Sequence, residues 1–188
     1  MNLFIDSTNI INKGGVEGIG FTGPCKKKKF TKITCLSKNK EIVAVHNDKV
    51  NTKIINQSRS LGCTKKTQIK TIEHDVKAII PVTAKVRIGK TENKLLNIVG
   101  DKGYILNEKD KADLLKNKKI KLITAFRKNQ KKKNSDKDKK LLKQRIKVEN
   151  AISKIKVFHR IHVRYDKKLV SYMGFLYLAL IHKSESKK

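Results

Sequence analysis

The sequence lacks tryptophan and is poor in proline, cysteine and acidic residues, with 2 prolines, 3 cysteines and 16 Asp and Glu among 188 residues. Cys25, Cys35 and Cys63 are an odd number and form no CxxC pair, so we expect reduced thiols and no zinc site. His159 and His162 have no further ligand partners near them in sequence and are expected to be ordinary surface or core histidines. This composition excludes a small secreted domain held together by disulfides.

Long hydrophobic runs are also missing. The longest, residues 169–181, is shorter than the about 20 residues that a membrane span requires. The apolar run at residues 3–5 is too short for a signal peptide. We therefore expect residues 169–181 to form a core helix of an intracellular protein with no membrane partner.

Basic charge is abundant: 46 Lys and Arg give a formal net charge of +30 and a pI of about 10.2. A polyanion is the obvious partner, and nucleic acid comes first. Lysines number 40 and arginines only 6, so an alternative is that lysine has accumulated on a solvated surface without creating a binding site. Four of the six arginines lie in the last 62 residues, where planar, bidentate phosphate donors are expected: Arg127, Arg145, Arg160 and Arg164.

The first half of the chain predicts mainly strands. A short strand at residues 3–5 is expected to end on Asp6, before a glycine-rich loop at residues 14–23. Residues 30–36 and 41–46 predict a hairpin. Three further segments complete this half, helical or mixed at residues 52–61 and 66–77 and an edge strand, containing Pro81, at residues 78–83.

The second half alternates strand and helix. A strand at residues 95–99, a helix at residues 107–115 and a strand at residues 120–125 predict parallel pairing in an α/β sheet. The segment 127–140 is almost purely charged and is expected to be a basic loop leading into a helix over residues 141–158.

Three acidic residues are placed where this order of elements would bring them together. Asp6 and Asp101 each follow an apolar strand, and the functional crevice of an α/β sheet lies at the carboxyl ends of its strands. Glu149 shares a 40° arc of the predicted helix with Arg145 and Lys156, at about 100° per residue. Singly, each acid is equally compatible with a cap, a turn or a solvated ion pair. Together they predict a carboxylate site for two divalent cations acting on a phosphodiester.

Motifs along the chain resemble the catalytic domain of insertion-sequence DDE transposases. The helix signature Y-x2-R-x3-E-x6-K is matched by Arg145, Glu149 and Lys156, with Leu142 where the tyrosine would stand. Further matches follow in the family's order: IDST at 5–8, FTKITCLSKNKEIVA at 30–44, GDKGY at 100–104, FRKN at 126–129, HRIHVRYDK at 159–167 and FLYLAL at 175–180.

The resemblance implies an α/β fold with a ribonuclease H-like mixed sheet flanked by helices. It implies that Asp6, Asp101 and Glu149 bind two Mg²⁺ ions, for which Mn²⁺ could substitute, and catalyse DNA cleavage and strand transfer. The implied partners are the element ends and target DNA, on which a homo-oligomer would assemble. The residues expected to contact DNA are Arg145, Lys156, Lys102, Arg127 and Arg164.

For domain organisation, we expect one catalytic domain over residues 1–182 and a disordered basic tail at 183–188. Asp6 lies so near the start that the helix-turn-helix domain common in this family is expected to be absent, or supplied by an upstream reading frame. The expected location is inside the cell with DNA: the cytoplasm or nucleoid, or the nucleus or a virus factory in another host. The alternative function is a non-catalytic DNA-binding remnant of a transposase, or another basic nucleic-acid-binding protein.

Overall fold

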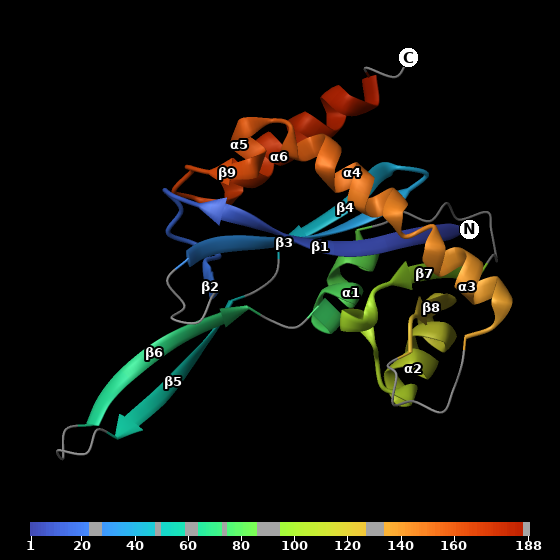
Figure 1. The fold of residues 1–188 in the computed structure, drawn as a ribbon, viewed down its shortest axis with the longest axis horizontal. Coiled ribbons are helices and arrows are strands. Elements are labelled where there is room, and N and C mark those ends of the chain that lie inside the picture. Colours follow the sequence, from blue (N-terminus) through green and yellow to red (C-terminus); the bar gives the residue numbers. More distant parts are fainter. Residues whose placement is uncertain are drawn as a thin grey trace.

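The fold is built around one mixed β-sheet. The computed structural model describes residues 1–22, 28–47, 50–58, 64–72, 75–85, 95–126 and 134–185. Seven strands form the sheet: β2, β3, β1, β7 and β8 lie side by side in that order, with β4 paired to β3 and β9 paired to β1. Figure 1 shows this sheet near the centre of the molecule, with helices on both sides.

The antiparallel half of the sheet comes from the first quarter of the chain. It contains β1 (Asn2–Asn12), β2 (Gly20–Thr22), β3 (Lys28–Lys38) and β4 (Glu41–Asn47). The predicted hairpin is confirmed as β3 and β4, joined at Asn39 and Lys40, whose φ angles are 49° and 71°. Two successive positive φ angles are typical of a type I′ turn, whose twist matches that of the flanking strands.

The parallel half follows the predicted strand and helix alternation. Strand β7 (Leu96–Gly100) leads through the short 3₁₀ helix η1 (Lys102–Tyr104) to α2 (Glu108–Lys118), and the chain returns as β8 (Ile120–Thr124). The Asn107 side chain caps α2 by accepting a hydrogen bond from the Asp110 N–H at 2.8 Å. Both β7 and β8 run parallel to β1. The predicted α/β fold with a ribonuclease H-like mixed sheet is confirmed: β4, β3 and β1 are antiparallel, and β7 and β8 continue parallel to β1.

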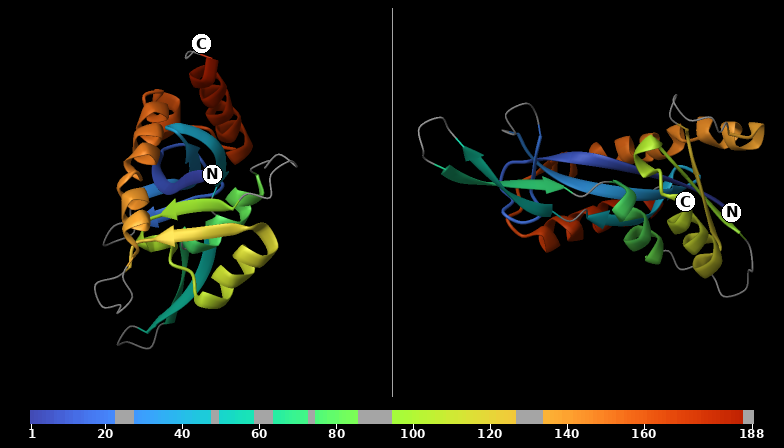
Figure 2. Two further views of the ribbon diagram at one scale, coloured as in Figure 1. Left: turned by 90° about the vertical axis from the view of Figure 1, so that its right-hand side faces the viewer. Right: turned by 90° about the horizontal axis from the view of Figure 1, so that it is seen from below.

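Helices cover the two faces of the sheet, and alternation along β1 decides what each face contains. Phe4 and Ile10 pack on the side of α4 (Ile146–Lys156) and α6 (Leu169–Glu185), whereas Leu3 and Ile5 pack toward α1 and Tyr104. Figures 1 and 2 show α4 and α6 on one side of the sheet, and α1 and α2 on the other. Because side chains of a strand alternate between faces, the even-numbered residues of β1 face α4.

Residues 50–84 differ from the prediction. They form the antiparallel strands β5 (Val50–Ser58) and β6 (Thr64–Ile72), which extend away from the main sheet in Figures 1 and 2, and the helix α1 (Asp75–Ala84). For residues 52–58 the expectation of helical or mixed structure was wrong, because β-branched residues dominate the apolar positions and favour a strand. Residues 59–61 of that segment lie outside the described residues. The segment 66–77 is mixed, since β6 ends at Ile72 and α1 begins at Asp75. The edge strand expected at residues 78–83 was also wrong. Ala78, Ile79 and Val82 are buried on one helical face, and Pro81 only removes one backbone donor within α1.

The helix expected over residues 141–158 is two shorter helices. Helix α3 (Asp136–Lys143) begins within the segment that was expected to be a basic loop, and α4 follows after a turn at Gln144 and Arg145. Asp136 and Asp138 in the first turn of α3 favour a start at this point, because acidic residues stabilise the N-terminus of a helix. Residues 127–133 of the predicted loop lie outside the described residues.

The C-terminal region adds α5 (His159–His162), the two-residue strand β9 (Val163–Arg164) and α6. Tyr172, Leu176 and Ala179 are buried, which confirms that α6 is a core helix. It continues to Glu185, so residues 183–185 are helical and the tail expected to be disordered does not begin at residue 183. Across the described part of the chain, no helix is long and apolar enough to cross a membrane.

Candidate active site

Asp6 lies in the middle of β1, not after its end as expected. The strand continues because residues 7–11 keep their antiparallel partners on β3 and Ile10 is completely buried. Asp6 is even-numbered and faces α4, with 22% of its side chain exposed. The Ser7 N–H donates to Asp6 Oδ1 at 2.9 Å, which leaves Oδ2 for other partners. Burial raises the pKa of the Asp6 carboxyl above its ordinary value.

Asp101 comes directly after β7, as predicted. Phe4 on β1 is in register with Val99 on β7, and two residues further along each parallel strand lie Asp6 and Asp101. Gly100 permits this approach, since a Cβ atom there would lie 2.9 Å from Ile5 Cγ2. The Asp101 side chain is 53% exposed. The two aspartates therefore lie beside each other at the carboxyl end of β7, on neighbouring strands.

Glu149 comes from α4 and completes the group, hereafter the carboxylate trio (Asp6, Asp101 and Glu149). Val148, Ala151, Ile152 and Ile155 anchor α4 against the sheet. Glu149 lies in the first turn of α4, where the helix dipole favours a negative charge, and its side chain is 46% exposed. Three elements distant in sequence thus supply the three acids.

The guanidinium of Arg145 lies among the carboxylate trio. Arg145 Nη1 is 4.0 Å from Asp6 Oδ2 and also 4.0 Å from Asp101 Oδ2, and Nη2 is 2.9 Å from Glu149 Oε1. Because both oxygens lie 4.0 Å from Arg145 Nη1, Asp6 Oδ2 and Asp101 Oδ2 are separated by at most twice that distance. Among the described residues, no three His, Cys, Asp or Glu side chains are arranged closely enough to form a metal-ligand group. The positive charge between the three acids is the guanidinium of Arg145.

The chemistry of the trio nevertheless fits a hard divalent cation. All available donors are carboxylate oxygens, the ligands that Mg²⁺ and Mn²⁺ prefer. The charges of Glu149 and Asp101 add to burial in raising the pKa of Asp6, whereas Ser7 and Arg145 lower it. The acids therefore interact electrostatically, and the site favours positive charge.

A hydroxyl network on the face of β1 opposite Asp6 was missed in the sequence. Ser7 Oγ lies 2.8 Å from Thr34 Oγ1 and is also hydrogen-bonded to the Tyr104 hydroxyl. This network connects the residue after Asp6 to the end of η1, which begins after Asp101. Ser7 and Tyr104 lie within the quoted motifs IDST and GDKGY, so the signal was present in the sequence, but nothing in it shows that the two hydroxyls meet.

Of the five residues expected to contact DNA, Lys102 is next to Asp101 in the chain, and Lys156 lies further along α4 than Glu149. Lys102 follows Asp101 and is exposed. Lys156, two turns after Glu149, donates from Nζ to the Asn9 carbonyl of β1 at 3.5 Å, and burial lowers the pKa of its ammonium group. Arg145, the third, contacts carboxylates as described above. Arg127, the fourth, lies outside the described residues.

Arg164, the fifth, was wrongly expected to contact DNA, because it is completely buried. Its Nη1 donates to the Glu17 carbonyl at 2.6 Å and to Thr31 Oγ1 at 2.9 Å. Its Nε and Nη2 donate to the carbonyls of Asp166 at 3.0 Å and Lys167 at 3.1 Å. With its donors satisfied inside the protein, Arg164 holds the loop after β1 against the start of α6.

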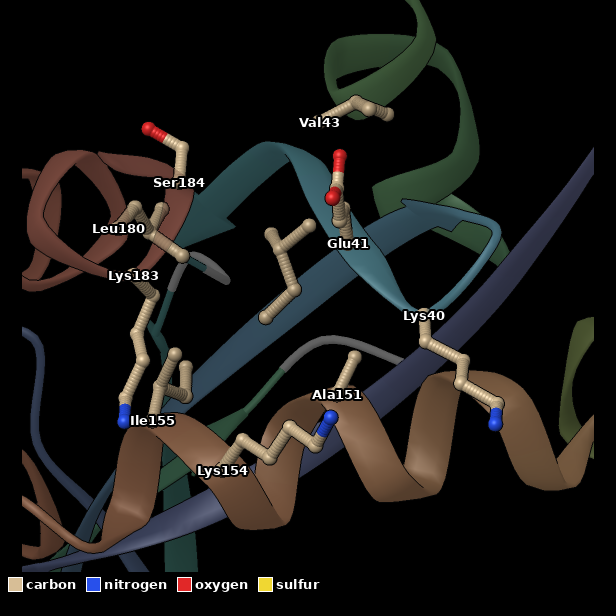
Figure 3. A pocket seen from close by; sticks show the side chains of 10 residues that line it. Lys40, Glu41, Val43, Ala151, Lys154, Ile155, Leu180, Lys183 and Ser184 are labelled. Atoms are coloured by element: carbon tan, nitrogen blue, oxygen red, sulfur yellow. The ribbon is translucent and has the colours of Figure 1, made fainter. Parts of the chain in front are cut away.

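A separate cavity of about 100 Å³ lies on the other flank of α4, between the β3–β4 hairpin and α6. Figure 3 shows Lys40 of the hairpin extending toward α4, which contributes Ala151 and Lys154, whereas the Glu41 carboxyl points away from that helix. None of the predicted site residues lines it. The trio therefore does not share this cavity.

Comparison with known proteins agrees with the resemblance to DDE transposases. The family model described as "Transposase DDE domain" matches residues 68–182. No curated protein gives a match. Among solved structures, a piggyBac transposase in a synaptic complex with hairpin DNA is similar at 17% identity with a TM-score of 0.41. That similarity covers 69% of this chain and 24% of the other, so the chain spans about a quarter of that protein.

The matched segment contains Asp101, Arg145 and Glu149 but not Asp6. Asp6 joins the group through the sheet geometry alone, since β1 pairs with β7 beside Asp101. The family match covers more than half of the residues, and the chain therefore belongs to the transposase DDE domain family.

Proposed function

We propose that this chain is a metal-dependent catalytic domain that cleaves and joins DNA strands during transposition. One observation carries the proposal: Asp6, Asp101 and Glu149 come from three separate elements and converge on a single guanidinium. A carboxylate is costly to bring near two others unless a cation balances the charge. This arrangement therefore favours a cation-binding catalytic site over three unrelated surface acids.

The residues that would hold the metal are Asp6, Asp101 and Glu149. When bound, two Mg²⁺ or Mn²⁺ ions would activate the attacking oxygen and neutralise charge on the leaving oxygen of a phosphodiester. Ser7 fixes Asp6 Oδ1 through its N–H, so Oδ2 is the oxygen that faces the site. The hydroxyls of Ser7, Thr34 and Tyr104 support the two strands that present the aspartates.

The proposed reaction has two steps. A water oxygen attacks a phosphorus at the element end, the bond to the 3′ oxygen breaks, and that oxygen leaves as a 3′ hydroxyl. This hydroxyl then attacks a phosphorus of target DNA, whose own bridging oxygen leaves. No covalent bond to the protein is needed in either step.

The rest of the site would position DNA. Lys102 is exposed next to Asp101, and Lys156 Nζ lies at the Asn9 carbonyl of β1, three residues beyond Asp6, so both lysines are available to DNA bound at the trio. Lysine contacts a phosphate as a point charge and carries no sequence information. The net charge of +30 would attract DNA over a longer range. The proposed partners are element ends and target DNA inside the cell, with a homo-oligomer assembled on them.

Cleavage of DNA that carries the sequences flanking the gene tests this proposal. The purified chain, with any protein encoded by the upstream frame, is incubated with Mg²⁺ or Mn²⁺, and strand breaks are resolved on denaturing gels. We expect metal-dependent nicking by the wild type and a loss of several orders of magnitude in Asp101→Asn, which removes one ligand charge. Asp113→Asn is the matched control, because Asp113 is exposed on α2, which covers the opposite face of the sheet.

The alternative function, a non-catalytic DNA-binding remnant, has a different outcome in the same experiment. The wild type would then bind DNA without nicking it under any metal condition. Asp101→Asn would be indistinguishable from the wild type, and the catalytic proposal would be abandoned.

A further inference from the structure

We propose that Arg145 is a built-in counter-cation of the carboxylate trio, and that its guanidinium and divalent metal ions exclude one another from the site. The inference rests on the proposed function in one respect, since it takes the trio to be the metal site. It assigns Arg145 a role in setting metal affinity, in addition to the DNA contact that the family resemblance implies.

The contacts place the guanidinium between the acids, not beside one of them. Its Nη1 lies equally far, 4.0 Å, from Asp6 Oδ2 and Asp101 Oδ2, while Nη2 lies 2.9 Å from Glu149 Oε1. The side chain is 27% exposed, so the protein encloses most of it. The Arg145 guanidinium therefore interacts with the two aspartates of the sheet as well as with Glu149, its i+4 neighbour on the helix.

The two cations cannot occupy the trio together. A magnesium ion requires ligand oxygens at about 2.0–2.1 Å in near-octahedral geometry. The guanidinium fills the space between the oxygens that would have to close on the metal, and it carries positive charge that repels a second cation there. Metal entry therefore requires the side chain of Arg145 to swing out.

The local backbone allows a side-chain movement without unfolding. Arg145 is in the turn between α3 and α4, where its N–H donates to the Leu142 carbonyl at 3.2 Å and its φ and ψ angles are helical. The backbone is thus fixed at this point, while the flexible arginine side chain can change rotamer. Once withdrawn, its planar group is available to a phosphate oxygen pair.

Equilibrium binding of Mn²⁺ in the absence of DNA tests the inference, with free Mn²⁺ measured by electron paramagnetic resonance. We expect Arg145→Gln, which removes the competing charge, to bind Mn²⁺ on the order of tenfold more tightly than the wild type. Arg145→Lys keeps a charge but cannot span the three acids, so its affinity is expected to lie between the two.

Lys139→Gln is the matched control. Lys139 pairs with Asp136 at 2.8 Å on α3, and both side chains are largely exposed, so the variant loses the same unit of charge away from the trio. Its Mn²⁺ affinity should equal that of the wild type. A tightening as large as that of Arg145→Gln would mean that net charge, and not exclusion by Arg145, controls metal binding, and would overturn the inference.

Thermal unfolding gives a second measurement. Without metal, Arg145→Gln leaves three carboxylates without their counter-cation and should unfold at a lower temperature than the wild type. Saturating Mn²⁺ should raise its midpoint by more than it raises that of the wild type, because ligand stabilisation grows with affinity. If Arg145→Gln does not fold without metal, Arg145→Lys takes its place in both measurements. An equal or smaller Mn²⁺-induced shift in the variant contradicts the inference.

The two proposals fail separately. Tighter Mn²⁺ binding by Arg145→Gln with no DNA nicking by the wild type supports the counter-cation and refutes the catalytic function. DNA nicking by the wild type, with no gain in Mn²⁺ affinity in Arg145→Gln, supports the catalytic function and refutes the counter-cation. If neither protein binds Mn²⁺, Arg145 is not what keeps metal out, and the inference is wrong.

Discussion

Arg145 and Arg164 lie 19 positions apart, and the protein uses the same side chain in two different ways. Arg145 is partly exposed and faces three carboxyl groups, one of them at 2.9 Å. Arg164 is completely buried and donates to three carbonyls and one hydroxyl at 2.6 to 3.1 Å. The first group can be replaced by another cation, whereas the second is held by neutral groups that no metal ion would compete for.

The comparison shows that acceptor chemistry separates a functional arginine from a structural one. Carboxylates near the surface can also bind water or a metal ion, so either can replace the arginine as their partner. The acceptors of Arg164 are buried or partly buried, and leaving such groups unpaired is costly. Changes at the trio should therefore affect activity more than stability, and changes at Arg164 should do the opposite.

The largest expected effect is that of Glu149→Gln on DNA cleavage. The substitution keeps size and hydrogen-bonding capacity but removes a ligand charge, so we expect strand cleavage to fall roughly a thousandfold or more. The free energy of unfolding should change by less than about 1 kcal/mol, because the lost ion pair is partly exposed. Cleavage rates and urea unfolding, measured together, check both values. A variant that keeps its activity would remove Glu149 from the site.

Arg164→Met tests the other side of the comparison. It removes four hydrogen bonds, one buried and three partly buried, and we expect a loss of about 3 kcal/mol in the free energy of unfolding. Mn²⁺ affinity should be unchanged at a temperature where the variant is folded. Urea unfolding followed by circular dichroism measures the loss. Equal stability of variant and wild type would show that the hydrogen bonds of Arg164 do not hold this region together.

Gly100→Ala addresses the approach of Asp101 to Asp6. The new methyl group would lie 2.9 Å from Ile5 Cγ2 and 3.2 Å from Tyr104 Cβ, so we expect a loss of about 1–3 kcal/mol in unfolding free energy, together with weaker Mn²⁺ binding. Gly174→Ala is the control. Nothing lies within 4 Å of its added methyl group, and alanine should stabilise α6 by about 0.5–1 kcal/mol. Equal effects at both glycines would contradict the close packing at Gly100.

The smallest expected effect is on the pH dependence of stability without metal. Burial raises the pKa of Asp6 in the folded protein above its ordinary value of 3.8, so the folded state binds its proton more readily than the unfolded state. The resulting stabilisation is present below the ordinary value and is lost as pH rises through the folded pKa. Asp6→Asn should therefore lose less stability than the wild type over this window. Urea unfolding at pH 3.5 and pH 7 compares the two, and identical changes would show that Asp6 titrates normally.

Most of the parallel half of the sheet could be predicted from the sequence. Strand β7, the asparagine-capped α2 and β8 are local signals, and the end of β7 correctly located Asp101. The register of β1 with β7, which places Asp6 beside Asp101, depends on long-range pairing, so the sequence could support it only through the family motifs. The predicted 40° arc put Arg145 and Glu149 in line beside the apolar face of the helix, and their side chains are in contact at 2.9 Å.

The errors also have their cause in contacts between residues that are distant in the sequence. Residues 78–83 are apolar without a clear period, so a strand and a helix were equally compatible until burial of Ala78, Ile79 and Val82 on one face selected the helix. Arg164 has an ordinary sequence neighbourhood, and its burial depends on Glu17 and Thr31, which are distant in the chain. Nothing local to Arg145 shows that two aspartates from the sheet would reach it.

The pairing of β1 with β9 has a consequence for how the protein is made. Asn12, at the end of the first strand, takes Arg164 as its parallel partner, and a Cβ atom on Gly14 would lie 2.1 Å from the Tyr165 carbonyl oxygen. During synthesis, β1 cannot form this pairing until β9, 152 positions further along the chain, has been made. Such distant pairings slow folding and leave a sheet edge uncovered in the meantime. The nascent chain is therefore most exposed to aggregation and proteolysis while its central strand is already complete.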